Sequence, residues 1–174
     1  SDILTFISPE MSNMYKLRYP FFKKKMSHIY NGFDPNFFKN LKHTKLKNDK
    51  LIIFYAGSFY GGNRSPFDLF DILSRLAKKN LINLKKIEIR IAGKIDAIIL
   101  NKINSLKIFS SIKLLGSISK SDVISNMKNS HILWLIISNE IYHYAGIPIK
   151  FFEYLFAKRF ILNFAPKNAV VNSF

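Results

Sequence analysis

The sequence contains no cysteine and few histidines among its 174 residues. Without cysteine there is no disulfide scaffold, no cysteine nucleophile and no thiolate-bound zinc. The four histidines argue against a histidine-rich metal site; they are His28, His43, His131 and His143. Long apolar runs are also missing, since the longest, Ile132–Ile137, is far shorter than the ~20 residues of a membrane span. No signal peptide is visible, so we expect a cytoplasmic protein, either soluble or bound peripherally at the inner face of the cytoplasmic membrane.

Acidic residues are scarce as well, with 11 Asp and Glu against 27 Lys and Arg and a net charge of +16. Clustered cations attract the phosphates of nucleic acids. Here the excess is spread out, at +6, +4, +4 and +2 over residues 1–50, 51–100, 101–150 and 151–174. The 25 Ile, 22 Lys and 16 Asn against 8 Ala and 3 Val are also typical of compositional drift. A basic nucleic-acid-binding α/β domain without catalysis therefore stays an alternative, and we expect no nucleic-acid partner.

From Leu51 onward, apolar runs of strand length alternate with amphipathic helical patterns. The expected strands are Leu51–Ala56, Lys86–Ala92, Ile112–Leu115, His131–Ile136 and Phe160–Phe164. The expected helices are Pro66–Lys79 with Ser65 as cap, Ile95–Leu106, a helix from Ser119 or Ser121 to Asn129, and Pro148–Lys158. Such alternation with short connections predicts an α/β fold with a doubly wound, Rossmann-like parallel sheet. The 48% hydrophobic content excludes a disordered basic tail.

The first 50 residues follow a different pattern. The expected elements are a strand at Asp2–Ile7, a helix at Pro9–Tyr19 capped by Ser8, an extended piece at His28–Tyr30, a turn at Asn31-Gly32, a short helix at Asn36–Leu41 and a basic linker at Lys42–Lys50. At the other end, a further helix is expected to begin near Asn168.

Two unusual loops follow the first and fourth strands of the regular region, at Gly57–Ser65 and Ser138–Ile147. Ligands of open α/β sheets bind beyond the carboxyl ends of the strands, where the strand order reverses. In the usual order of five such strands the first and fourth are neighbours. Both loops are therefore expected to border one crevice.

The first loop combines three glycines, Gly57, Gly61 and Gly62, with Arg64 at the start of a helix. Glycines let the backbone approach a ligand, the helix N-terminus favours an anion, and the guanidinium offers a forked donor. The loop matches neither the dinucleotide pattern nor the P-loop pattern. It predicts either an anion site or a plain turn with a solvated arginine.

The second loop leads into a helix that begins near Pro148 and places Lys150 in its first turn. A cation there is unfavourable by roughly 0.3–1 kcal/mol unless an anion lies in front of it. Glu153 follows among aromatic residues and should have a partner, for which ribose hydroxyls are one possibility. The alternative is a surface pair between Lys150 and Glu153.

Five segments together resemble retaining GT-B glycosyltransferases. Ile147–Leu162, IPIKFFEYLFAKRFIL, is similar to their nucleotide-sugar signature of a Pro, a Lys, then Phe-Glu-Tyr and an apolar strand. Segments similar to other parts of the family precede it in the same order: Ile29–Asp34, Phe54–Ser58, Ile89–Gly93 and Ile112–Ile118. The resemblance covers most of the chain, from Ile29 to Leu162.

The resemblance implies the C-terminal, donor-binding half of a GT-B architecture. Asp2–Ser8 resembles the last strand of the preceding domain. The implied organisation is a remnant of the N-terminal domain and crossover at 1–41, the linker at 42–50, and a donor-binding domain at 51–174 that lacks its final helices. The implied activity is transfer of a hexosyl group from a nucleoside-diphosphate sugar, with retention, to a glycan or lipid-linked acceptor of polysaccharide or lipopolysaccharide biosynthesis. This piece alone is expected to lack full activity.

The resemblance also assigns roles to residues. Glu153 would bind the ribose, Gly116, Ser117 and Ile118 the base edge, and the backbone at Ile149 and Lys150 the diphosphate. Arg64 and Lys150 would stabilise the leaving group, with no metal or cofactor. The complete donor-binding set is Gly57, Ser58, Gly61, Gly62, Gly93, Gly116, Ser117, Ile118, Gly146, Ile147, Pro148, Ile149 and Glu153.

Two positions depart from the family pattern. Ser58 stands where many members have Arg. Ala145 stands where many have a first Glu, with Glu140 nearby in a longer loop. Both departures concern how the donor sugar is positioned.

A basic triplet, Lys23-Lys24-Lys25, follows Phe21 and Phe22. Aromatic side chains beside a basic cluster suit an anionic membrane surface. The alternative is a solvated triplet in a connecting segment.

Overall fold

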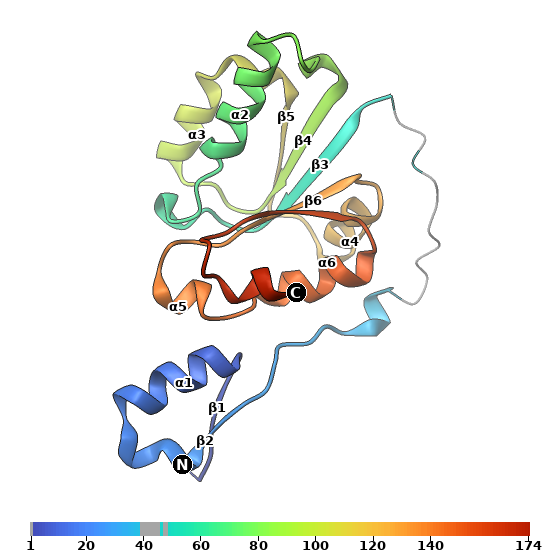
Figure 1. The fold of residues 1–174 in the computed structure, drawn as a ribbon. Coiled ribbons are helices and arrows are strands. Elements are labelled where there is room, and N and C mark those ends of the chain that lie inside the picture. The colour runs from blue at the N-terminus through green and yellow to red at the C-terminus, as the bar shows by residue number, and fades with distance from the viewer. Residues whose placement is uncertain (1, 39–45, 47–48) are drawn as a thin grey trace.

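The computed structural model describes residues 2–38, 46 and 49–174 of the chain. The predicted linker at Lys42–Lys50 and the end of the helix predicted at Asn36–Leu41 fall largely outside the described residues. A small unit at the N-terminus and a larger α/β domain are visible in Figure 1.

The larger domain is built on five parallel strands. They are β3 (Leu51–Ala56), β4 (Ile87–Ala92), β5 (Ile112–Gly116), β6 (Ile132–Ile136) and β7 (Phe160–Phe164). Their order in the sheet is β5-β4-β3-β6-β7. The predicted doubly wound sheet is confirmed, and the order reverses between β3 and β6, the first and fourth strands of this domain.

Helices cover both faces of this sheet, as Figure 1 shows. Side chains of α2 (Phe67–Lys78) and α3 (Ala97–Asn104) form one core with Ile53, Tyr55 and Trp134. Side chains of α4 (Lys120–Lys128), α6 (Ile149–Ala157) and the 3-10 helix η6 (Val170–Ser173) form a second core with Phe54 and Leu133. Because successive strand residues face opposite sides, β3 and β6 are apolar on both faces and read as continuous hydrophobic runs.

Short helical pieces complete the connections of the domain. They are η3 (Tyr60–Gly62), η4 (Leu84–Lys86), η5 (Lys107–Ser111) and α5 (Ile141–Tyr144). α5 was not predicted, because four residues are too few to show a helical period.

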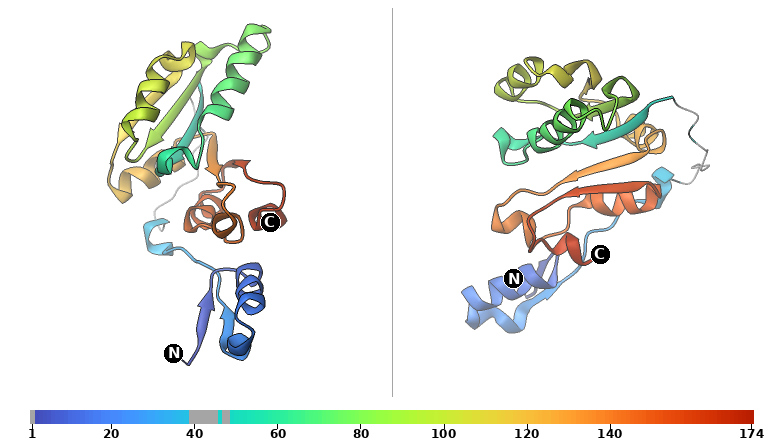
Figure 2. Two further views of the ribbon diagram at one scale, coloured as in Figure 1. Left: turned by 90° about the vertical axis from the view of Figure 1, so that its left-hand side faces the viewer. Right: turned by 45° about the horizontal axis from the view of Figure 1, so that its top comes forward.

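The N-terminal unit is a two-stranded parallel sheet with a helical crossover. It contains β1 (Leu4–Phe6), α1 (Pro9–Arg18), the 3-10 helix η1 (Pro20–Lys25) and β2 (Met26–His28), and η2 (Pro35–Phe38) follows it. Ser8 caps α1 as predicted, since its Oγ accepts a hydrogen bond of 3.0 Å from the Met11 amide. Figure 2 shows this unit on the side of the larger domain that carries α5 and α6.

Several predicted boundaries differ from the structure. An extended piece was expected at His28–Tyr30, and the strand in this region lies earlier, at Met26–His28, because it pairs with Leu4–Phe6. The helix expected near Asn168 is only the one-turn η6. Ser65 Oγ does accept a hydrogen bond from the Phe67 amide at 3.2 Å, but α2 begins at Phe67 with Pro66 in the cap position.

We expect the glycine at the end of β4 to be required for folding. Gly93 has a φ of +131°, and a Cβ there would overlap the backbone carbonyl of Gly57. Gly93→Ala should therefore lower the free energy of unfolding by about 2 kcal/mol or more. Gly32→Ala is the matched control, because nothing lies within 4 Å of a Cβ at Gly32. Urea unfolding of both variants measures the difference, and equal stabilities would contradict the prediction.

Candidate functional site

The two loops singled out in the sequence meet at the carboxyl ends of β3 and β6. These strands are hydrogen-bonded neighbours, with Ile53 opposite Ile132. Residues of both loops line a common pocket, and Arg64 of the first loop lines a smaller pocket of about 180 Å³ with Gly146 and Pro148. The predicted shared crevice is therefore present at the reversal of strand order.

Lys150 extends from the first turn of α6 to the carboxyl end of β3. Its Nζ donates a hydrogen bond of 2.7 Å to the Ala56 carbonyl and lies 4.8 Å from the ring centroid of Tyr55. Burial, and then the positive charge of Arg64, lower the pKa of Lys150 to about 8, while the Glu153 carboxylate opposes this shift. Lys150 thus contacts a carbonyl and an aromatic ring, both of which stabilise an ammonium. The alternative of a surface ion pair between Lys150 and Glu153 is not what the structure shows, because Glu153 pairs with Lys120.

Gly57 provides the space that the Lys150 ammonium occupies. A Cβ at Gly57 would lie 2.5 Å from Lys150 Nζ, and the φ of Gly57 is +146°. Position 57 therefore requires glycine for two reasons: the positive φ, and the space that the Lys150 ammonium fills.

Arg64 belongs to the same loop and is partly buried. Its guanidinium carbon is 4.7 Å from the ring centroid of Tyr60. Its Nε is buried and has no hydrogen-bond partner among the described residues. A buried donor without a partner is costly, by about 1–3 kcal/mol, and is therefore a candidate ligand contact.

Glu153 has the partner that its apolar surroundings require, but this partner is a protein side chain. Glu153 is buried on α6, and its Oε1 forms an ion pair with Nζ of Lys120 at the start of α4. Sequence reasoning missed Lys120. The signal was available, since Lys120 is also a cation in the first turn of a helix, where the dipole disfavours it.

Backbone hydrogen bonds align the ends of three neighbouring strands. The Gly57 amide donates to the Ala92 carbonyl, and the Gly93 amide donates to the Gly116 carbonyl, both at 2.8 Å. The predicted contacts at Gly57, Gly93 and Gly116 therefore lie side by side along one edge of the sheet. Gly116 and Ser117 are exposed at that edge, whereas Ile118 packs against the core on the α4 and α6 face.

The remaining predicted residues lie either in the first loop or at the start of α6. Ser58, Gly61 and Gly62 belong to the first loop, where the Ser58 carbonyl accepts a 3.0 Å hydrogen bond from the Tyr55 hydroxyl. Burial raises the pKa of this Tyr55 hydroxyl to about 12. Pro148 and exposed Ile149 form the start of α6.

Gly146 and Ile147 are fixed by the N-terminal unit. A Cβ at Gly146 would lie 2.6 Å from Cδ1 of Ile7, and the Ile147 carbonyl accepts a 2.9 Å hydrogen bond from Asn31 Nδ2. Ser8 Oγ donates to the carbonyl of Ala145, the residue that departs from the family pattern. The N-terminal unit thus fixes the backbone that leads into α6.

The part of the chain that the structure describes contains no group of three or more His, Asp or Glu side chains arranged to hold a metal ion. Within the same residues, no helix is both long and apolar enough to cross a bilayer.

The fold is that of the Rossmann-like domains of GT-B glycosyltransferases. The chain is similar to the lipopolysaccharide outer core galactosyltransferase WaaB in its apo form (TM-score 0.64, 18% identity, 94% of this chain and 43% of that one). It is also similar to HepE of Anabaena in complex with UDP (0.66, 13%, 99% and 53%) and to the pneumococcal O-GlcNAc transferase GtfA in complex with UDP and GlcNAc (0.61, 13%, 95% and 30%).

The chain thus spans between 30% and 53% of the length of these three proteins. No protein-family model and no curated protein matches it by sequence. At these identities the likeness establishes the fold.

Direct titration of Lys150 tests its environment. By NMR of isotope-labelled lysines, its ammonium should titrate near pH 8, well below the ordinary value of 10.5. Arg64→Gln should raise the pKa of Lys150, because removing a neighbouring positive charge favours the protonated amine. Arg75→Gln, which removes an exposed arginine paired with Asp71, is the control and should have no effect. An unchanged titration in Arg64→Gln would show that the two cations do not interact.

Proposed function

We propose that the chain is the nucleotide-sugar-binding part of a retaining glycosyltransferase. The observation that supports this most directly is the pair of cations at the strand-order reversal, Lys150 at the N-terminus of α6 and Arg64 with its unpaired buried Nε. Amides at a helix N-terminus and two adjacent cations are suited to a diphosphate. Neighbours of the same fold have been crystallised with UDP, which agrees with such a donor.

The proposed mechanism is electrostatic. In transfer of a hexosyl group the bond from the anomeric carbon to the diphosphate oxygen breaks, a bond from that carbon to the acceptor oxygen forms, and the acceptor hydroxyl loses its proton. Negative charge accumulates on the leaving diphosphate. Arg64, Lys150 and the first amides of α6 would stabilise that charge without rearrangement. This role requires no metal ion, and we propose none. Retention, the hexosyl class and a glycan or lipid-linked acceptor belong to the same proposal.

The proposed binding path follows the edge of the sheet. Gly116, Ser117 and Ile118 after β5 would contact the base, and Glu153 would accept hydrogen bonds from the ribose. Gly57, Gly93 and the loop from Ser58 to Gly62 would lie under the diphosphate. The Glu153 carboxylate is already paired with Lys120. The ribose hydroxyls would therefore either replace Lys120 or bind the carboxylate together with it.

Melting-temperature shifts test the donor proposal. UDP or GDP, or their sugar conjugates, should raise the melting temperature at millimolar concentration, because ligands that bind only the folded state stabilise it. Glu153→Gln should reduce the shift by weakening ribose binding. Lys120→Met breaks the same ion pair from the other side, keeps the carboxylate, and should retain the shift.

Two results would count against the donor site. One is the absence of any shift with well-folded protein. The other is an equal loss in Glu153→Gln and Lys120→Met, which would indicate that the ion pair matters only for structure.

We also propose that the segment around η1 contacts an anionic membrane. Phe21 is 97% exposed and Phe22 53% exposed, directly before three lysines. Exposed aromatic side chains can enter the interface of a bilayer while lysines approach anionic headgroups, at ~1 kcal/mol for each cation. A membrane contact also suits a lipid-linked acceptor.

Vesicle sedimentation tests this contact. The protein should sediment with vesicles that contain phosphatidylglycerol, and much less with neutral vesicles. Replacing Phe21 and Phe22 with serine, or Lys23 and Lys24 with glutamine, should each reduce the bound fraction severalfold. The matched controls are Phe160→Ser, at an exposed aromatic residue of β7, and the pair Lys78→Gln and Lys79→Gln at the end of α2. Equal losses in the controls would mean that only overall charge and hydrophobicity matter.

A further inference from the structure

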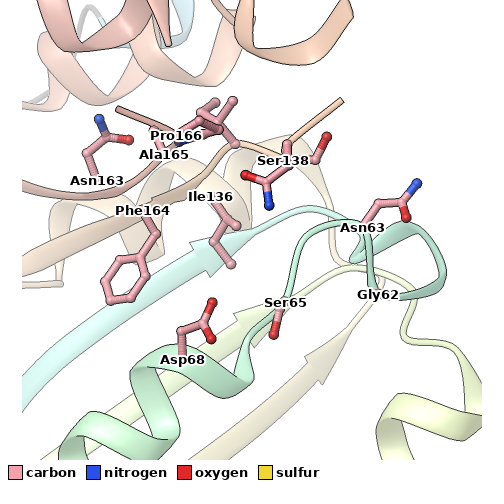
Figure 3. Close-up of a pocket in the computed structure, with 12 residues that line it drawn as sticks. Gly62, Asn63, Ser65, Asp68, Ile136, Ser138, Asn163, Phe164, Ala165 and Pro166 are labelled. Atoms are coloured by element: carbon pink, nitrogen blue, oxygen red, sulfur yellow. The ribbon is translucent and has the colours of Figure 1, made fainter. Parts of the chain in front are cut away.

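The larger of the two pockets described above, which both loops line, lies at the ends of β6 and β7. Its volume is about 440 Å³, within the range of small-molecule sites. Figure 3 shows Asn63 and Ser65 of the first loop and Asp68 of α2 on one side, facing Ser138 and Pro166 across the opening. Among the residues that line this pocket, only Gly62 belongs to the predicted donor-binding set.

Three polar side chains at the pocket are exposed to solvent and available to a ligand. Among the described residues, the carboxylate of Asp68 and the side-chain amides of Asn63 and Asn139 have no hydrogen-bond or ion-pair partner. Ser138 is different, because its Oγ lies 2.6 Å from Nδ1 of His143 and is held in place. Three exposed polar side chains without a protein partner therefore line one pocket.

The chemistry of these groups selects an uncharged, hydroxyl-rich ligand. In a chain of net charge +16, Asp68 is the one charged residue among those that line the pocket. A carboxylate repels phosphates and acidic sugars and accepts hydrogen bonds from hydroxyls, and amides both donate and accept. Phe164 and Pro166 add apolar surface, which suits the C–H faces of a sugar ring.

The position of the pocket indicates which sugar would bind. Along the sheet edge the proposed base contacts lie at β5 and the diphosphate contacts at β3, so β6 and β7 come next. The smaller pocket beside Arg64, Gly146 and Pro148 adjoins the start of α6, where the donor's own sugar would be attached. The larger pocket therefore lies one step further from the diphosphate.

We infer that this larger pocket is a subsite for an uncharged saccharide residue of the acceptor. The assignment to the acceptor rests on the proposed transferase function. The assignment to a saccharide rests on the side chains of Asp68, Asn63 and Asn139. It assigns part of acceptor recognition to the domain that also binds the donor.

Protein-observed NMR with free sugars tests the subsite. Glucose, galactose and N-acetylglucosamine, titrated at millimolar concentration with and without saturating UDP, should shift the amide resonances of residues around Asp68 and Asn139. Asp68→Asn should weaken this binding by about tenfold or more, as expected for losing hydrogen bonds to a charged group. Asp71→Asn removes a carboxylate from the same helix outside the pocket and should bind sugars like the original protein.

The results separate this inference from the proposed function. Shifts that persist with UDP, depend on Asp68 and are unaffected by UDP-glucose support the acceptor subsite. Displacement of the free sugar by UDP-glucose but not by UDP would assign the pocket to the donor's sugar and overturn the inference. Shifts elsewhere, or equal effects of Asp68→Asn and Asp71→Asn, would also overturn it. If UDP itself fails to bind while the Asp68-dependent sugar shifts remain, the donor proposal is wrong and the bound sugar can no longer be called an acceptor. The inferred saccharide site is then still supported.

Discussion

A buried ammonium at the reversal of strand order is the interaction on which the site depends. Lys150 places its Nζ on the Ala56 carbonyl, in space that only a glycine at position 57 leaves open. A carbonyl oxygen satisfies a hydrogen bond but does not neutralise the charge, and Arg64 adds a second cation close enough to lower the pKa of Lys150. Desolvation and repulsion between like charges both oppose this arrangement. An anion close to both cations would offset the two penalties, and this supports the proposed diphosphate site.

The N-terminal unit contributes to the site through the backbone that precedes α6. Ser8, Ile7 and Asn31 contact three successive residues, Ala145, Gly146 and Ile147. These residues lead directly into Pro148 and the first turn of the helix. A movement of the N-terminal unit relative to the larger domain would therefore change the position of the α6 N-terminus.

Much of the fold could be predicted because its signals are local. The strands at Leu51–Ala56 and Phe160–Phe164 match the expected ranges, since apolar runs between turn residues define them. The position of Lys150 could also be flagged, because a cation in the first turn of a helix conflicts with the helix dipole. Both signals can be read within a few residues of sequence.

What could not be predicted depends on contacts between distant segments. Lys120 and Glu153 are 33 positions apart, and nothing in either segment specifies that they meet. Gly146 was expected to contact the donor, and no sequence pattern shows that its missing side chain admits Ile7. The position of β2 is likewise set by its pairing with β1 rather than by its own residues. The ends of elements and the partners of polar groups are decided by tertiary packing, which overrides local preference.

The charge of the chain is distributed unevenly along the functional edge of the sheet. Its overall excess of cations would suit a nucleic acid, but the residues at the functional edge are not uniformly basic. Exposed backbone follows β5, two cations converge at β3, and a pocket with a single carboxylate lies at β6 and β7. A polyanion extended along this edge would meet the carboxylate of Asp68 at one end of the series. A single nucleoside diphosphate uses only the exposed backbone and the two cations, and leaves the pocket at β6 and β7 to an uncharged group. The distribution of charge along the sheet edge therefore suits a single diphosphate better than the continuous phosphate backbone of a nucleic acid.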